Sequence, residues 1–256
     1  MYFRNPKLLI PINWDADAVA FISAASITDV KQRTAVNQLV TDLKSASLWT
    51  KMQAIYPVIG GTDSTHKYNL KDPQDTDGAF RLVFTGSWTH SSTGMKPSTA
   101  YADTKFSPSN VVSINSAHMS FYSRTNSNGT EVEMGVGQDT LLEARTSGTS
   151  YMRMFQNTVN SAYSDSDSLG FYQTTRTASN AIASYKNGVS KVTGTTASST
   201  ASIANYFIGA WNNAGPAYSS TKECSFASIG TGFSSTEAAT LYTIVQAYQT
   251  LLGRQV

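Results

Sequence analysis

The apolar residues of the first quarter of the chain recur at helical spacing. Residues 14–56 are therefore predicted to be helical, in three segments. The middle segment begins at Thr28, which can cap a helix. Its apolar face consists of Val36, Leu39, Val40 and Leu43. A third stripe precedes Pro57 and consists of Leu48, Trp49, Met52, Ile55 and Tyr56. We expect these stripes to pack against the rest of the protein, with a helical oligomer seam as the alternative.

From Ala79 onward the apolar period changes to two. In "AFRLVFTGSW" the side chains of Phe80, Leu82 and Phe84 fall on one face, which predicts a β-strand. Similar short stretches follow as far as "CSFASIG", residues 224–230. Between two of them lies Asn187-Gly188, a pair that accepts the positive φ angles of a type I′ turn. This pair predicts a two-residue β-hairpin.

The last segment of the chain has helical spacing again. Ser234 and Glu237 have the spacing of a capping box, and Gly253 is suited to end the helix. The apolar face between them consists of Leu241, Ile244, Val245, Tyr248, Leu251 and Leu252. The sequence thus predicts one C-terminal helix.

These patterns divide the chain into three parts. We expect an N-terminal arm and helical attachment segment over 1–57, a polar connector over 58–78, and a sandwich domain with a terminal helix over 79–256. About ten to twelve short antiparallel strands are predicted, which favours a β-sandwich or jelly roll. The predicted fold class is mainly β.

Composition narrows the classes of partner. Only 14% of the 256 residues are charged and the net charge is +2, without the clustered Lys and Arg of a nucleic-acid surface. The sequence has no apolar run of 18 residues, so membrane insertion is not predicted. The first apolar run, Leu8-Leu9-Ile10, is broken by Pro11 and is too short for a secretory signal. Cys224 is the only cysteine, so no intrachain disulfide is expected, and its thiol is predicted to be buried.

Several stretches together resemble the concanavalin A-like jelly roll of lectins, glucanases and laminin-G modules. They are "SFYSRTNSNGT" (120–130), "ASYKNGVSKVTG" (183–194), "YFIGAWNNAG" (206–215) and the closing residues 223–256. The resemblance implies an antiparallel jelly-roll sandwich from Ala79 to the end. Because this sandwich hosts lectins, hydrolases and inert spacers, the fold does not settle the function.

The whole chain, including "GAFRLVFTGSWTHSSTG" (78–94), is similar in texture to virion proteins of tailed phages of gut bacteria. This resemblance implies a fibre, spike or decoration component that is made in the host cytoplasm and located on the virion. Its expected partners are other virion proteins, bound through the helical start, and a cell-surface or mucus glycan. The helical stripes and the fibre-like relatives also suggest a homotrimer.

Aromatic and amide residues in predicted loops are candidates for glycan contact. Aromatic faces can stack on the C–H patches of sugars, while amides hydrogen-bond to the hydroxyls. The candidates are Trp88, His90, Tyr101, Trp211, Asn212 and Asn213. By strand alternation, Trp211 lies opposite Ile208. We therefore expect Trp211 either to stack on a ligand or to lie beneath the terminal helix.

Two pairs of carboxylates are further candidates for a functional site. Glu131 and Glu133 share a strand face, as the carboxylates of a retaining glycosidase would, but Gly135 stands where a third carboxylate is needed. The alternative is that both are solvated surface residues. Asp165 and Asp167 could begin a calcium site, with a solvated loop containing Asx turns as the alternative.

No cofactor and no zinc site are expected, because the three histidines lack ligand spacing. The sequence therefore favours a non-enzymatic virion protein with a lectin-like module. A purely structural virion component and a polysaccharide hydrolase remain alternatives.

Overall fold

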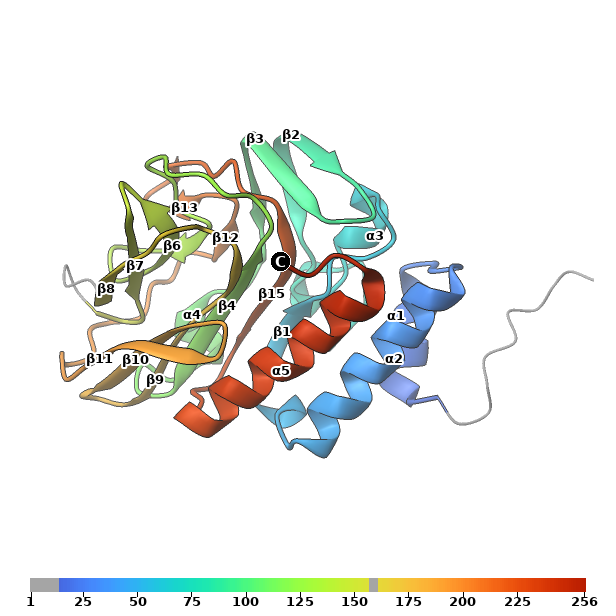
Figure 1. The fold of residues 1–256 in the computed structure, drawn as a ribbon, viewed down its shortest axis with the longest axis horizontal. Coiled ribbons are helices and arrows are strands. Elements are labelled where there is room, and N and C mark those ends of the chain that lie inside the picture. Colours follow the sequence, from blue (N-terminus) through green and yellow to red (C-terminus); the bar gives the residue numbers. More distant parts are fainter. Residues whose placement is uncertain (1–13, 157–160) are drawn as a thin grey trace, which may run out of the picture.

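The computed structural model describes residues 14–156 and 161–256 (Figure 1). Its α-helices are α1 (Ala16–Ala24), α2 (Val30–Ser45), α3 (Asp63–His66), α4 (Pro108–Val111) and α5 (Ser235–Leu252), with short 3-10 turns η1 (Trp49–Lys51) and η2 (Asp77–Ala79). Its strands are β1 (Met52–Tyr56), β2 (Val83–His90), β3 (Met95–Asp103), β4 (Ala117–Ser123), β5 (Met134–Val136), β6 (Thr140–Thr146), β7 (Thr149–Arg153), β8 (Ser161–Ser164), β9 (Gly170–Ala178), β10 (Ala181–Lys186), β11 (Val189–Gly194), β12 (Phe207–Ile208), β13 (Trp211–Asn212), β14 (Pro216–Ala217) and β15 (Cys224–Gly230).

The strands form a mainly antiparallel sheet that nearly closes into a sandwich. One layer has the order β11-β10-β9-β4-β15, and β1 pairs with the free edge of β15. The path continues through β3 and β12 to the second layer, β5-β6-β7-β8. Strands β11 and β8, at the two ends of this path, lie against each other and bring the sheet close to closure. The predicted mainly β sandwich with helices near both ends is confirmed.

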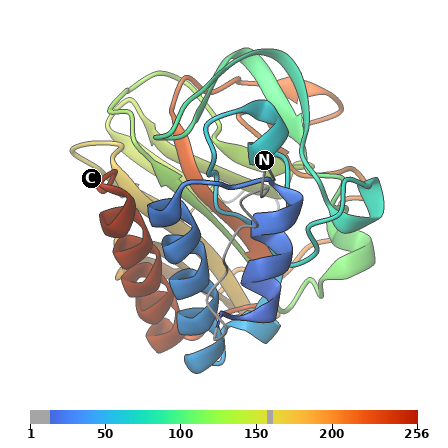
Figure 2. The same cartoon turned by 90° about the vertical axis from the view of Figure 1, so that its right-hand side faces the viewer.

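The central strands of the first layer, β9, β4 and β15, are buried on both faces, whereas the end strand β11 is largely exposed. The inner face of the layer meets the second layer in an apolar core that includes Met119, Tyr172 and Leu142. Its outer face is covered by α5 and α2, with α1 beside α2 (Figures 1 and 2). The apolar stripe of α2 and that of α5 are buried in this second core. The expectation that the helical stripes pack against the rest of the protein is confirmed.

The prediction of a helix across residues 48–56 is wrong. After the short turn η1, these residues form β1, which pairs antiparallel with β15 from Met52 opposite Gly230 to Tyr56 opposite Ala227. Ile55 faces the helices, while Ala54 and Tyr56 face the sandwich core. A strand buried on both faces carries an almost continuous apolar run, and such a run cannot be distinguished from a buried helix by spacing alone.

Other local predictions hold. Asn187 and Gly188 both have positive φ, and they join β10 to β11 in a two-residue hairpin. Ser234 and Glu237 form the expected capping box, and Gly253 ends α5 in the left-handed conformation. The cap of α2, in contrast, is Asp29 and not Thr28, because the Asp29 carboxylate accepts a hydrogen bond from the backbone N–H of Gln32.

A buried arginine fixes the end of α5 to the sheet. Arg254 is 1% exposed and donates hydrogen bonds to the backbone oxygens of Pro57, Val58 and Ser225. It thereby connects the residues that follow β1 to the start of β15. No helix in the described residues is long and apolar enough to span a bilayer.

Candidate functional site

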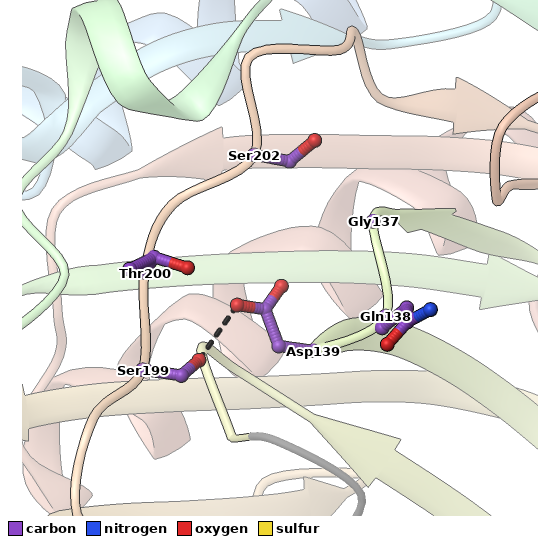
Figure 3. Close-up of a pocket in the computed structure, with 6 residues that line it drawn as sticks. All are labelled: Gly137, Gln138, Asp139, Ser199, Thr200 and Ser202. Carbon is purple, nitrogen blue, oxygen red and sulfur yellow. Dashed lines mark hydrogen bonds between the residues drawn. The ribbon is translucent and has the colours of Figure 1, made fainter.

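A polar pocket opens at one edge of the second layer, where the β5–β6 turn meets the segment that follows β11 (Figure 3). Its volume is about 270 Å³. It is lined by Gly137, Gln138, Asp139, Ser199, Thr200 and Ser202. Hydroxyl, amide and carboxylate groups therefore surround a space that can hold a small polar ligand. We call it the Asp139 pocket.

Asp139 is the only charged residue that lines this pocket, and its position is fixed by hydrogen bonds. It is 7% exposed and accepts a hydrogen bond of 2.6 Å from the Ser199 hydroxyl (Figure 3). Burial raises the pKa of Asp139, although hydrogen bonds from Ser199 and Thr140 oppose the shift. Its second carboxylate oxygen points into the space bounded by Thr200, Ser202 and Gly137 (Figure 3).

Trp211 is hydrogen-bonded to Gly137, one of the residues that line the Asp139 pocket. Its indole Nε1–H donates to the carbonyl oxygen of Gly137 at 2.5 Å, while the Gly137 N–H donates to the Asn212 carbonyl. Gly135 is required opposite the ring, because a Cβ at that position would lie 2.8 Å from Trp211 Cδ1. Trp211 was expected either to stack on a ligand or to lie beneath the terminal helix. The structure excludes the position beneath the helix.

The ring of Trp211 forms a stacked pair with Tyr218. The two ring centroids are 6.2 Å apart and the planes are inclined by 27°. Trp211 is partly exposed and Tyr218 is 54% exposed. An accessible aromatic surface thus lies beside a polar pocket, and Gly137 connects the two.

The other predicted glycan-contact residues do not converge on this pocket. Asn212 is buried and its amide donates to the Asn205 carbonyl, which holds the chain in place. Asn213 lies in the turn between β13 and β14. Tyr101 lies on β3, where it stacks on Phe207 at 4.2 Å.

Trp88 and His90 lie on β2, and not in a loop as predicted. Their rings are 6.1 Å apart between centroids and lie nearly parallel. Both rings form T-shaped pairs with the Phe84 ring. The structure therefore places this pair at a separate location.

Glu131 and Glu133 face a buried lysine. Lys222 is fully buried, and its Nζ lies 3.2 Å from Glu131 Oε2 and 3.0 Å from Glu133 Oε1. Glu131 also accepts from the N–H and hydroxyl of Thr221, while Glu133 accepts from the Ser220 hydroxyl. The carboxylates share one face, as predicted, but the expectation of a solvated surface pair is wrong. We call this group the Lys222 triad.

Two carboxylates that share one ammonium group cannot ionise with equal ease. Complete burial raises the pKa of Glu133, and the nearby charge of Glu131 adds to the shift. The pKa of Glu131 is lowered: burial opposes the shift, but hydrogen bonds from Thr221 and the charge of Lys222 outweigh it. These carboxylates are therefore occupied in holding the chain together.

Asp165 and Asp167 also face a lysine. Lys186 Nζ lies 2.6 Å from Asp165 Oδ1 and 3.0 Å from Asp167 Oδ1. Asp165 is largely buried and accepts a hydrogen bond from the Tyr172 hydroxyl, so the solvated-loop interpretation is wrong for it. Asp167 does form the expected Asx turn, with the Leu169 N–H. No group of three or more metal-binding side chains occurs in the part of the chain that the structure describes.

Sequence reasoning missed all six residues that line the pocket. Asp139 follows a glycine-containing turn and gives no sign of burial, and Ser199, Thr200 and Ser202 lie in an ordinary Ser/Thr-rich run. A further missed residue is Glu143 on β6. Burial, with the charge of Glu133 as the next cause, raises the pKa of Glu143 to about 7.

Comparison with known proteins shows the fold. No family model matches the sequence, and no curated protein matches it. Among solved structures, the chain is similar to botulinum neurotoxin type C, whose cell entry depends on interaction with two ganglioside molecules. The TM-score is 0.55, and the identity is 10% over 78% of this chain and 53% of the toxin chain.

Two further structures are similar. The binding domain of botulinum neurotoxin DC, in complex with rat synaptotagmin II, matches with a TM-score of 0.53 and 10% identity, over 77% of this chain and 52% of that one. Domain 4 of the GH43 extracellular arabinanase AbnA from Geobacillus stearothermophilus, in complex with arabinotriose, matches with a TM-score of 0.46 and 16% identity, over 75% of this chain and 98% of that one. The chain spans about half of the toxin chains, and the likeness shows a shared β-sandwich alone.

Replacement of Lys222 tests the Lys222 triad. Lys222→Met leaves two carboxylates buried without their cation, and loss of one partner of a buried ion pair costs about 3–5 kcal/mol. We expect the free energy of unfolding at pH 7, measured by urea denaturation, to fall by that amount. Lys96→Met, which changes an exposed lysine on β3, is the control and should leave stability nearly unchanged. If Lys222→Met has the same urea midpoint of unfolding as wild type, the stabilising role assigned to Lys222 is wrong.

Glu143 predicts a pH-dependent effect. Its folded pKa of about 7 lies above the ordinary value of 4.5, so the stability it contributes is present below about pH 4.5 and is lost as pH rises through 7. Glu143→Gln stays neutral at every pH. Because the side chain is partly exposed, we expect the variant to be more stable than wild type by only about 1 kcal/mol at pH 8. Urea unfolding should show no difference at pH 4.5, and an equal or lower stability at pH 8 would refute the assignment.

Proposed function

We propose that this chain is a non-enzymatic carbohydrate-binding module of a phage virion, and that the Asp139 pocket with the adjacent aromatic pair is the binding site. The observation that carries the proposal is the double hydrogen bond at Gly137, which fixes Trp211 against the pocket. A sugar can place its C–H face on an aromatic ring while its hydroxyls reach neighbouring polar groups. Here the Trp211–Tyr218 pair offers the face, and Asp139 offers an acceptor.

The surroundings of the pocket support a small polar ligand. Ser199 and Thr200 supply hydroxyl groups that can both donate and accept hydrogen bonds. Arg153 donates to the Gln138 carbonyl, and its charge acts on both Asp139 and Glu143. Asp139 is the only charged residue that lines the pocket, and its carboxyl group favours an uncharged sugar over an acidic one.

One observation supports binding without hydrolysis, and a second supports glycan contact. The carboxylates with glycosidase spacing, Glu131 and Glu133, are held by Lys222 and surrounding hydrogen bonds, whereas a retaining mechanism needs both at the scissile bond. The neurotoxin type C structure concerns interaction with ganglioside molecules, so a sandwich of this kind is compatible with glycan contact. Since one fold serves many functions, the proposal depends on the pocket and not on this likeness.

Binding is tested with the intact chain on an array of neutral and sialylated oligosaccharides, followed by calorimetry on the best binder. We expect Trp211→Ala and Asp139→Asn each to weaken binding at least tenfold, which corresponds to about 1.4 kcal/mol. Asp72→Asn, at a carboxylate outside the pocket, is the matched control and should bind as wild type. Each variant is first shown to unfold cooperatively.

Absence of binding by the wild-type chain, or unchanged binding by both pocket variants, would refute the glycan site. Release of reducing sugar from a bound oligosaccharide would refute the non-enzymatic part of the proposal and would favour the hydrolase alternative.

The virion part of the proposal is supported by the sequence resemblance to tailed-phage structural proteins. It includes other virion proteins as partners and a homotrimer as the assembled form. We expect capsid, portal or tail genes on either side of the gene for this chain, and a trimer by light scattering at micromolar concentration. Flanking genes of cellular metabolism would contradict the virion setting, and a monomer would contradict the trimer.

A further inference from the structure

A second aromatic surface lies on the edge strand β2, apart from the Asp139 pocket. In the described residues β2 pairs only with β3, so its other edge is unpaired. Phe84, Trp88 and His90 project from it as one contiguous group, because each ring contacts the other two. All three side chains are partly exposed, and Phe84 and Trp88 also pack against the edge of the sandwich core. We call this group the β2 aromatic strip.

A cleft of about 300 Å³ adjoins the β2 aromatic strip. Phe84 forms part of its wall, and the rest is lined by Asp63, Ser64, Lys67, Arg81, Leu82 and Val83. Its two cations are already paired, since Lys67 contacts Asp75 at 2.5 Å and Arg81 contacts Asp75 and Asp77. Asp63, which also lines the cleft, is an exposed residue. The cleft thus offers no unpaired positive charge to an acidic ligand.

A chain of hydrogen bonds fixes where the proton of His90 resides. The Gly61 N–H donates to Nε2 of His66, so that nitrogen must carry a lone pair. The proton of neutral His66 is therefore on Nδ1, which lies 2.9 Å from Nδ1 of His90 and donates to it. It follows that neutral His90 carries its own proton on Nε2.

His66 keeps this arrangement over the ordinary pH range. It is 1% exposed, and burial, followed by the charges of His90 and Arg254, lowers its pKa to about 3. His90 Nε2 has no hydrogen-bond partner in the described chain and is not enclosed by it. An oriented N–H donor therefore stands beside the Trp88 ring with its position set by a backbone amide.

We propose that the β2 aromatic strip is a second carbohydrate contact, selective for uncharged sugars, in which a sugar stacks on Trp88 and accepts a hydrogen bond from His90 Nε2. The inference rests on the proposed carbohydrate-binding function but on none of the residues of the Asp139 pocket. A module with two such contacts can hold a branched or multivalent glycan more tightly than either contact alone.

The proton assignment is tested without a ligand. Long-range ¹H–¹⁵N spectra of the imidazole groups, recorded on the intact chain at pH 7.5, should show His66 protonated at Nδ1 and His90 at Nε2. A spectrum with His66 protonated at Nε2 would overturn the hydrogen-bond chain and with it the oriented donor.

The binding site is tested on the same array of neutral and sialylated oligosaccharides. Four proteins are compared: wild type, Trp211→Ala, Trp88→Ala and His90→Phe. His90→Phe keeps an aromatic ring beside Trp88 and removes the Nε2–H donor. It therefore tests the contact even if Trp88→Ala disturbs the strand. We expect Trp211→Ala to retain binding to a subset of neutral glycans, and Trp88→Ala and His90→Phe each to weaken that subset at least tenfold.

The outcomes separate the two sites. If Trp211→Ala abolishes all binding while Trp88→Ala and His90→Phe bind as wild type, the Asp139 pocket stands and the second contact is refuted. If the β2 variants alone lose binding, the second contact stands and the Asp139 pocket is refuted. Preference of the residual binding for sialylated glycans would overturn the selectivity for uncharged sugars, and absence of binding by wild type would refute both sites.

Discussion

The candidate site depends on the buried charge of Lys222. Three stretches of chain are joined beside Lys222: residues 131–133, residues 208–212 and residues 218–222. Lys222 holds the carboxylates of the first, while backbone hydrogen bonds join Gly209 to Glu133 and Ser220 to Gly209. Trp211 and Tyr218 belong to the second and third stretches, so their stacking is a consequence of these connections. A buried ion pair stabilises only when its remaining hydrogen bonds are satisfied, and here Ser220 and Thr221 supply them.

Burial of the central strands of the first layer on both faces decides the rest of the architecture. Strands β4 and β15 are buried at every position, since α5 and α2 cover one face and the second layer covers the other. Polar residues in these strands must therefore find partners inside. His118, for example, hydrogen-bonds to Ser228 and to the Thr231 carbonyl, and burial lowers its pKa to about 4.

Features that depend on residues close together in the sequence were predicted correctly. The capping box at Ser234, the Asn187-Gly188 turn and the stripe of α2 each depend on neighbouring residues, and each was correct. Strand β1 was missed because its apolar run fits a buried helix as well as a buried strand, and only the pairing with β15 makes it a strand. The Asp139 pocket was missed for a similar reason: its two walls are about sixty residues apart in sequence, and a Ser/Thr-rich run has no spacing that reveals which hydroxyls face a carboxylate. Trp211 was identified by type, yet its neighbours followed only from the tertiary structure.

The helical cover over the first layer has a consequence for how such a module could diversify. Substitutions on either face of that layer would disturb a packed core. The turns at residues 137–139, 199–202 and 213–218 are half-buried or exposed, with Asp139 as the buried exception. If the proposed site binds glycans, selection for new ligands would act on these short turns without compromising folding. A set of natural variants would then differ mostly along one margin of the molecule, with the helix-covered side held nearly constant.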